Sequence, residues 1–217
     1  PCAGPGPVAV RPPEFEIEGQ AITMALRDLR PVCGVRTLAN GVSEHRWRGT
    51  CCADAGLGLE LVFRCADASP VVRFAYTLHA AAPRRLTRAG GRDRLVYFGV
   101  DLAALPCRTE IRLSEFDESV HSFRLTEREV RDTAFANGLA VMGPLLAAGD
   151  GRRTLLAAYE HGSTSPDAFV QFRLAANGAV RVEAVKGNYW HGRALGPDRP
   201  FETLWCEAAM VDRKSTR

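Results

Sequence analysis

Residues 170–184 read VQFRLAANGAVRVEA, and this stretch indicates the fold class most directly. Apolar and polar residues alternate on both sides of Asn177-Gly178, as in two half-buried strands joined by a turn. A two-residue loop at Asn177-Gly178 would set Leu174 opposite Arg181. A three-residue loop, residues 176–178, places Gly178 in the left-handed position of a bulged turn. It also aligns both apolar rows. We therefore predict the pairs Leu174 with Val180, Phe172 with Val182, and Val170 with Ala184.

The same alternation recurs along the chain. Residues 57–65 and 72–78 flank a turn at Asp67–Pro70 and predict a second hairpin. Only residues 125–131 have a locally helical pattern, which is barely two turns long. Many short strands with few helices predict an all-β fold, a large antiparallel β-sandwich (supersandwich) with at most one or two short helices. Further strands are expected at residues 95–100, 109–113, 122–125 and 154–159.

Composition predicts one globular domain behind a short arm. Residues 1–13 are rich in proline and glycine, so we expect a flexible arm there and a single sandwich domain over 14–217. Hydrophobic residues make up 46% of the 217 residues, which allows a sizeable core. The net charge of +3 arises from interspersed signs, so nucleic acid is not an expected partner. The basic group at residues 84–94 is interpreted as a solvated loop.

Cysteine usage indicates the cellular compartment. The seven cysteines form no C-x-x-C pair and lack metal-ligand spacing, so we predict reduced, mostly buried thiols in a cytoplasmic protein without metal or cofactor. No N-terminal apolar stretch suits a signal peptide. The longest apolar run, residues 139–148, contains Gly143 and Pro144 and is far too short to span a bilayer, so no membrane association is expected.

Acidic residues offer only weak candidates for hydrolytic chemistry. Glycoside hydrolysis needs two carboxylates about 5–10 Å apart. Glu160, which precedes His161, and Asp167 form one candidate group, and the acids of residues 115–118 form another. Both groups also fit strand ends and turns. Because the chain holds 25 acidic residues, such groups arise by chance, and we assign no catalytic residue.

Aromatic residues are the better candidates for binding. Aromatic faces with polar neighbours suit sugar rings, which stack through their C–H faces. Tyr189 and Trp190 lie between glycines that permit a turned, exposed loop, and Asn188 precedes them. Successive side chains point oppositely in extended structure, so one ring would face a ligand while the other anchors the loop. Trp205 is interpreted as a core or interface anchor.

Several stretches carry a family resemblance over roughly residues 57–207. They are residues 114–125 (SEFDESVHSFRL), 159–162 (YEHG), 166–169 (PDAF), 186–189 (KGNY) and 201–205 (FETLW). In these stretches the chain resembles the N-terminal β-sandwich domain of α-galactosidase-type glycoside hydrolases, family 36. More loosely, residues 45–49 (HRWRG) are similar to an aromatic loop that some members place near the substrate pocket.

The resemblance implies a non-catalytic module. In that family both catalytic aspartates belong to a (β/α)8 barrel that follows the sandwich, and no residue here matches them. The expected partners are that barrel, an α-galactoside and, in the full-length protein, further subunits of a homo-oligomer. The resemblance adds Trp47 to the candidates chosen for their aromatic and polar character, so the predicted substrate-binding residues are Trp47, His161, Asn188, Tyr189 and Trp190. Because the chain stops at Arg217, we expect an apolar surface near the C-terminal strand, formed by Phe201, Leu204 and Trp205.

Three alternatives stay open at this point. The chain could be an autonomous carbohydrate-binding module that uses Tyr189 and Trp190. It could be a self-contained hydrolase that uses Glu160 and Asp167. It could also be a purely structural assembly protein. The sequence identifies neither the sugar nor its linkage.

Overall fold

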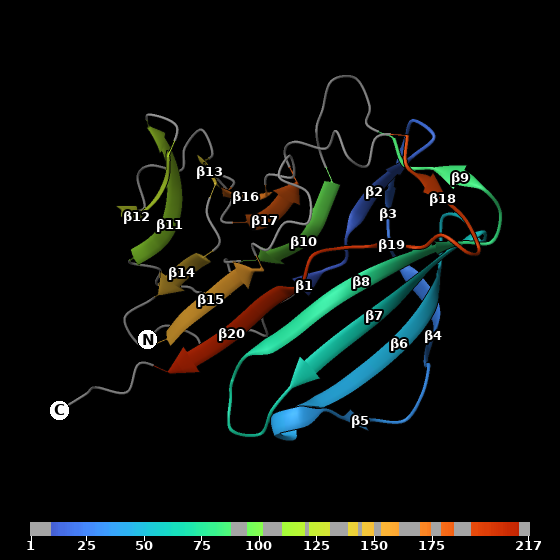
Figure 1. Ribbon diagram of the computed structural model, residues 1–217, viewed down its shortest axis with the longest axis horizontal. Coiled ribbons are helices and arrows are strands. Elements are labelled where there is room, and N and C mark those ends of the chain that lie inside the picture. Colours follow the sequence, from blue (N-terminus) through green and yellow to red (C-terminus); the bar gives the residue numbers. More distant parts are fainter. Residues whose placement is uncertain are drawn as a thin grey trace, which may run out of the picture.

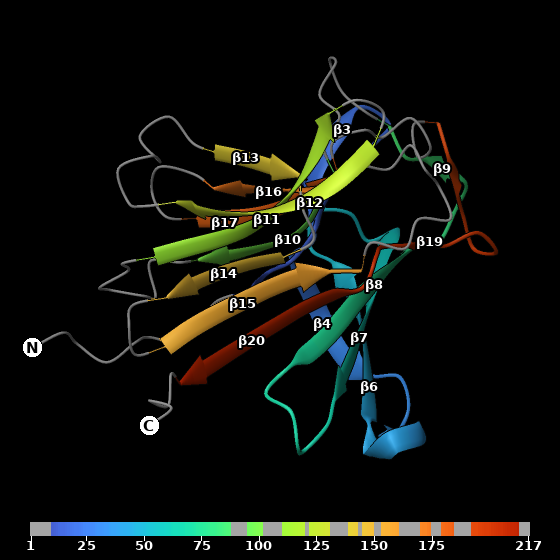
Figure 2. The ribbon, with the colours of Figure 1, turned by 60° about the vertical axis from the view of Figure 1, so that its left-hand side comes forward.

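The chain folds into two antiparallel sheets that share one core (Figure 1, Figure 2). The computed structural model describes residues 10–87, 95–101, 110–119, 122–130, 139–142, 145–149, 153–160, 170–174, 179–184 and 192–212. Within these residues, one 3-10 helix, η1 (Ala39–Gly41), accompanies the strands. A two-stranded sheet, β9 (Arg84–Arg85) with β18 (Ala194–Leu195), completes the architecture. The predicted all-β sandwich class is confirmed.

The smaller sheet contains seven of the described strands. Its order is β13-β16-β17-β10-β2-β3, and β1 pairs with β10 beside this path. The bounds are β1 Val10–Arg11, β2 Glu14–Ile17, β3 Gln20–Thr23, β10 Leu95–Asp101, β13 Leu139–Met142, β16 Val170–Leu174 and β17 Ala179–Ala184.

The larger sheet contains eleven of the described strands. Its order is β12-β11-β14-β15-β20-β8-β7-β6-β4, with β19 beside β8 and β5 beside β6. The bounds are β4 Leu26–Pro31, β5 Arg36–Thr37, β6 Ser43–Cys51, β7 Leu57–Cys65, β8 Val72–Ala80, β11 Glu110–Ser119, β12 Ser122–Val130, β14 Leu145–Gly149, β15 Arg153–Tyr159, β19 Phe201–Glu202 and β20 Cys206–Asp212. In both views the β5 end of β6 and β7 lies away from the smaller sheet.

The strand pairing of both predicted hairpins is confirmed, whereas the predicted loop at residues 176–178 lies outside the described residues. Strands β16 and β17 pair in the predicted register, with Phe172 opposite Val182 and Leu174 opposite Val180. Phe172 is fully buried, which is the reason a one-residue slip would be costly. Strands β7 and β8 form the second hairpin. The strands expected at 95–100, 109–113, 122–125 and 154–159 also form, as β10, β11, β12 and β15.

The helical prediction for residues 125–131 is wrong. Residues 122–130 form β12, which pairs with β11 along its whole length. A two-turn helix is marginal by itself, and the ladder to β11 supplies a backbone partner for each residue instead.

One core holds the two sheets together. Phe15 and Ile17 from β2 meet Phe201 and Leu78 from the larger sheet in one buried cluster. The Phe15 and Phe201 rings make an edge-to-face contact with centroids 6.0 Å apart. Tyr159 of β15 likewise contacts Phe172 of β16, with ring centroids 5.6 Å apart. These contacts make the sandwich a single packing unit across both sheets.

Candidate functional site

The central strands of the larger sheet have two unlike faces. Cross-strand pairs place Trp47 opposite Leu61, and Leu61 opposite Tyr76, so these side chains share one face. We call this the inner face, because the smaller sheet packs on part of it. The alternate residues, including Arg46 and Glu60, share the outer face.

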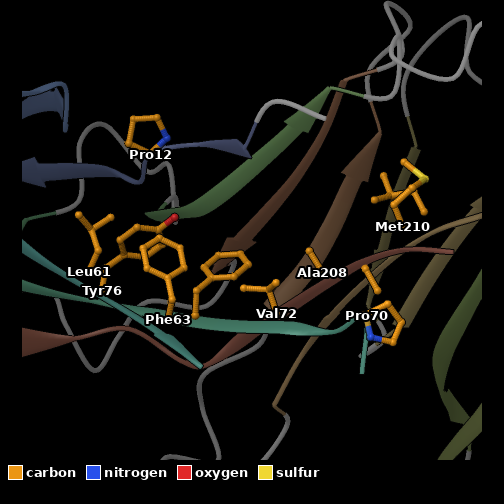
Figure 3. A pocket seen from close by; sticks show the side chains of 11 residues that line it. Pro12, Leu61, Phe63, Pro70, Val72, Tyr76, Ala208 and Met210 are labelled. Atoms are coloured by element: carbon orange, nitrogen blue, oxygen red, sulfur yellow. The ribbon is translucent and has the colours of Figure 1, made fainter. Parts of the chain in front are cut away.

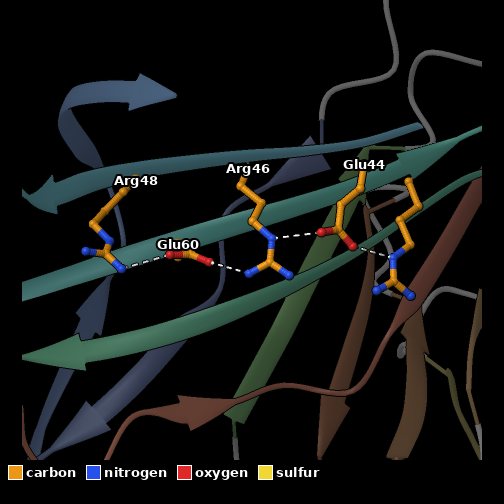
Figure 4. Close-up of polar contacts among 5 residues, drawn as sticks. Glu44, Arg46, Arg48 and Glu60 are labelled. Carbon is orange, nitrogen blue, oxygen red and sulfur yellow. Dashed lines mark hydrogen bonds and ion pairs between the residues drawn. The ribbon is translucent and has the colours of Figure 1, made fainter. Parts of the chain in front are cut away.

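An ionic row crosses the outer face (Figure 4). Glu44 accepts hydrogen bonds from Arg46 Nε and Arg64 Nε, each at 2.8 Å. Glu60 accepts from Arg46 at 3.2 Å and from Arg48 at 2.8 Å. Although burial acts to raise the pKa of Glu44, the hydrogen bonds and positive charges of Arg46 and Arg64 hold that pKa below its ordinary value. Each of the two carboxylates is therefore paired with two arginines across β6 and β7, and Arg46 is shared between them.

The row ends at a stacked tryptophan. Trp205 has the guanidinium of Arg64 at 4.2 Å from its ring centroid and that of Arg73 at 5.3 Å. Arg73 also pairs with Glu160 and, at 3.2 Å, with Glu207. Trp205 is half-buried beneath these arginines and does not belong to the hydrophobic core, so its predicted role as a core or interface anchor stays a prediction. Glu160 is held in an ion pair, and Asp167, the second acid of that candidate group, lies outside the described residues.

A small pocket borders Trp47 at the edge of the larger sheet. Its volume is about 310 Å³, and Pro31, Val35, His45 and Trp47 contribute to its lining. Trp47 is 36% exposed, so its ring is accessible. This pocket combines an aromatic face with a histidine, which is a combination that suits a sugar ring.

Exposed apolar side chains gather in the same stretch of chain. Leu29, Val32 and Val35 are 50%, 44% and 61% exposed. Together with Trp47 they make up four of the seven large hydrophobic residues that are exposed among the described ones. We call these four residues the Trp47 patch. Among these four, the lining of the small pocket brings Val35 and Trp47 together. Exposed apolar side chains that lie together are typical of a contact site for another protein surface.

A second, somewhat larger hollow lies on the inner face (Figure 3). Its volume is about 390 Å³, and the side chains that line it come from β7, β8, β15 and β20 and from Pro70 in the turn between β7 and β8, with Pro12 opposite. We call it the apolar recess; its main lining residues are Leu61, Phe63, Val72, Phe74, Tyr76 and Met210.

Four of the predicted substrate-binding residues cannot be placed. His161, Asn188, Tyr189 and Trp190 lie outside the described residues, so their relation to Trp47 stays a prediction. Of the five predicted residues, Trp47 is therefore the one that the structure places.

The residues predicted to form an apolar surface at the C-terminal strand are wrong, although that strand does carry exposed apolar side chains. Phe201 is 1% exposed because its ring packs into the core against Phe15. Leu204 packs against the same core, and Trp205 lies under two guanidinium groups. The exposed apolar residues at this strand are instead Val211 of β20 and Val72, which pairs with Ala208 of β20.

Cysteines and other reactive groups add no further site within the part of the chain that is described. Cys51 and Cys206 are buried, Cys65 is half-buried, and Cys33 and Cys52 are exposed, all as free thiols. The sequence predicted mostly buried thiols, but two of these five cysteines are exposed. No group of three metal-binding side chains occurs among the described residues. No helix in that part is long and apolar enough to cross a membrane.

Comparison with known proteins identifies the fold. No family model and no curated protein matches the sequence. Among solved structures, the chain is similar to a variant of the GH36 α-galactosidase AgaA from Geobacillus stearothermophilus in complex with 1-deoxygalactonojirimycin, at 12% identity and a TM-score of 0.61, over 95% of this chain and 32% of that one. AgaB from the same organism gives 13% identity and a TM-score of 0.61, over 94% and 32%.

A related enzyme class shares the fold as well. The α-N-acetylgalactosaminidase NagBb from Bifidobacterium bifidum matches at 9% identity and a TM-score of 0.53, over 94% of this chain and 31% of its own. The chain therefore has the fold of one part of the GH36 α-galactosidases, which confirms the resemblance seen in the sequence at the level of fold. It spans about a third of the length of these enzymes.

Proposed function

We propose that this chain is a non-catalytic module of an α-galactosidase-like glycoside hydrolase. One observation carries the proposal: the match covers 95% of this chain but 32% of the AgaA chain. Those enzymes therefore contain a further part of about twice this size, to which the sequence resemblance assigns the catalytic aspartates. The expected family position of the module is N-terminal to a (β/α)8 barrel.

The Trp47 patch is the surface that we assign to contact with the catalytic barrel. Interfaces with a permanent neighbour are apolar at their centre, and the patch supplies four exposed apolar side chains. The adjoining pocket, with His45 and Trp47, supports a contribution to an α-galactoside site beside the barrel. His161, Asn188, Tyr189 and Trp190 remain proposed members of the same sugar-binding set. Oligomer contacts and a cytoplasmic location belong to the same proposal.

An activity assay tests the non-catalytic assignment. We expect the chain alone to show no turnover of an aryl α-galactoside, because no residue of this chain matches the catalytic aspartates that the resemblance places in the barrel. Turnover that is lost in Glu160→Gln but kept in Glu207→Gln would contradict the proposal and favour the self-contained hydrolase. The second variant is a matched control, because both carboxylates pair with Arg73.

The length of the native reading frame is the second test. A frame that continues past Arg217 for long enough to encode a barrel would agree with the module. A frame that ends there, together with tight galactoside binding, would favour an autonomous carbohydrate-binding module. The same short frame without binding would favour a structural assembly protein.

A further inference from the structure

The apolar recess is lined by both buried and exposed side chains. Phe74, Tyr76 and Leu155 line it, yet they are 3%, 4% and 2% exposed, whereas Val72 beside them is 37% exposed. The hollow therefore has a buried floor and an accessible margin. Its volume of about 390 Å³ falls in the range of small-molecule sites. A protein partner would need a far more extended contact surface.

The side chains that form the wall of the recess come from adjacent strands and are aligned by the strand register. Leu61 pairs with Tyr76, and Phe63 pairs with Phe74, across β7 and β8. Val72 pairs with Ala208 across β8 and β20. Because paired residues point to the same face, these side chains form one continuous wall. The ladders hold that wall in place, so the recess does not depend on a single loop.

The lining is almost entirely hydrocarbon. None of the side chains lining the recess carries a charge, and the Tyr76 hydroxyl is the one side-chain oxygen among them. Three aromatic rings lie in sequence: Phe63 and Phe74 have centroids 6.4 Å apart, and Phe74 and Tyr76 have centroids 5.8 Å apart. Burial raises the pKa of Tyr76, with a further contribution from Cys206, so the phenol is neutral.

A sugar does not fit this lining, because its hydroxyl groups would lose hydrogen bonds to water without replacement. An anion or cation is excluded for the same reason. Aromatic and aliphatic hydrocarbon groups gain from leaving water and from edge contacts with the three rings.

We propose that the apolar recess is a binding site for a small, uncharged, predominantly aromatic or aliphatic molecule. The ligand lies between Pro12 and the wall formed by Leu61, Phe63 and Tyr76. Its apolar body contacts the aromatic rings, and a single polar atom reaches the Tyr76 hydroxyl. This site is separate from the Trp47 pocket and does not rest on the proposed function.

Fluorescence titration with N-phenyl-1-naphthylamine, an uncharged two-part aromatic probe, tests the site on the whole chain. We expect saturable binding of one probe per chain with a Kd of about 10–100 μM, as for a small apolar ligand in a partly enclosed site. Val72→Glu places a charge at the margin and should weaken binding at least about 10-fold. Val211→Glu is the matched control, because Val211 is also 37% exposed but does not line the recess. The Kd of the probe for the Val211→Glu variant should differ from that of the unaltered chain by less than about 2-fold.

A second variant fills the recess instead of charging it. Ala208→Phe should abolish probe binding while the thermal unfolding transition remains cooperative. Absence of saturable binding to the unaltered chain would overturn the proposal. Equal weakening by Val72→Glu and Val211→Glu would also overturn it. The proposal would also be overturned if sedimentation showed a dimer that the Val72→Glu substitution dissociates. The recess would then be an interface between two copies of the chain.

Discussion

On the outer face of the larger sheet, the buried carboxylate of Glu44 is stabilised by neighbouring arginines. Glu44 has a side chain that is 1% exposed, and it is stabilised by two guanidinium groups from β6 and β7. A buried carboxylate without such partners would be protonated or would destabilise the fold. Because the arginines themselves are 36% and 27% exposed, solvent still reaches their outer side and screens part of the attraction.

Glu44→Gln should lower the free energy of unfolding at pH 7 by about 1–3 kcal/mol, because two charge-assisted hydrogen bonds are weakened. The folded-state pKa of Glu44 is depressed, so its contribution is present above the ordinary value of 4.5 and is lost as the pH falls below it. The variant should therefore lose less stability than the unaltered chain below pH 4.5. Urea denaturation at several pH values measures both effects.

The matched control for this experiment is Glu18→Gln. Glu18 also pairs with an arginine, at 2.9 Å from Arg84, but its side chain is 49% exposed. An exposed pair contributes little, so the change should stay within about 0.5 kcal/mol. Equal losses in the two variants would contradict the role given to burial of Glu44.

Elements of this fold are specified by alternation and close strand contacts. The β16–β17 register follows from two apolar rows that must face the core together. By contrast, β4 meets β6 through an irregular register between Arg27 and Arg30. Gly49 lies in β6 opposite this irregularity, where an added Cβ would lie 3.0 Å from Arg27 O and 3.0 Å from Leu26 Cβ.

Gly49→Ala should therefore destabilise the chain by about 1–3 kcal/mol, because backbone and Cβ atoms of β4 would have to move. The gain from reduced backbone entropy, about 0.5–1 kcal/mol, does not offset this contact. Gly34→Ala is the control, since nothing lies within 4 Å of its added Cβ and its φ is not positive. Thermal unfolding of both variants compares them. An unchanged midpoint in Gly49→Ala would show that β4 adapts without cost.

The whole molecule depends on contacts between the two sheets. Phe201 of β19 is 1% exposed and packs edge-to-face on Phe15 of β2. Thr203, which follows β19, accepts a hydrogen bond from Tyr76 N at 3.0 Å and donates its own N–H to Tyr76 O at 2.9 Å. These hydrogen bonds attach the segment between β19 and β20 to β8 of the larger sheet. They thereby help to hold Phe201 in the shared core.

Phe201→Ala should lower the free energy of unfolding by about 3–5 kcal/mol and should destabilise both sheets together. The reason is that one buried cluster contains residues from each sheet. Near- and far-ultraviolet circular dichroism should therefore give coincident transitions in the variant. Val211→Ala, at an exposed position on β20, serves as the control. Two separate transitions would mean that the sheets fold as independent units.

The sequence alone determined the all-β class, the two hairpins and the β16–β17 register, because period-two alternation is a local pattern that each strand carries by itself. It also indicated the fold through the family-36 resemblance. It failed at residues 125–131, where pairing with β11 outweighs a weak helical tendency.

Only the tertiary structure decided which apolar residues are covered. Phe201 and Trp47 are both aromatic residues in strands, yet Phe201 is 1% exposed and Trp47 is 36% exposed. Likewise, alternation of apolar and polar residues places Leu61, Phe63 and Tyr76 on the inner face. It does not predict that an unfilled hollow separates these side chains from Pro12. Coverage depends on which segments of the second sheet lie opposite each strand, and this long-range arrangement leaves no local pattern in the sequence.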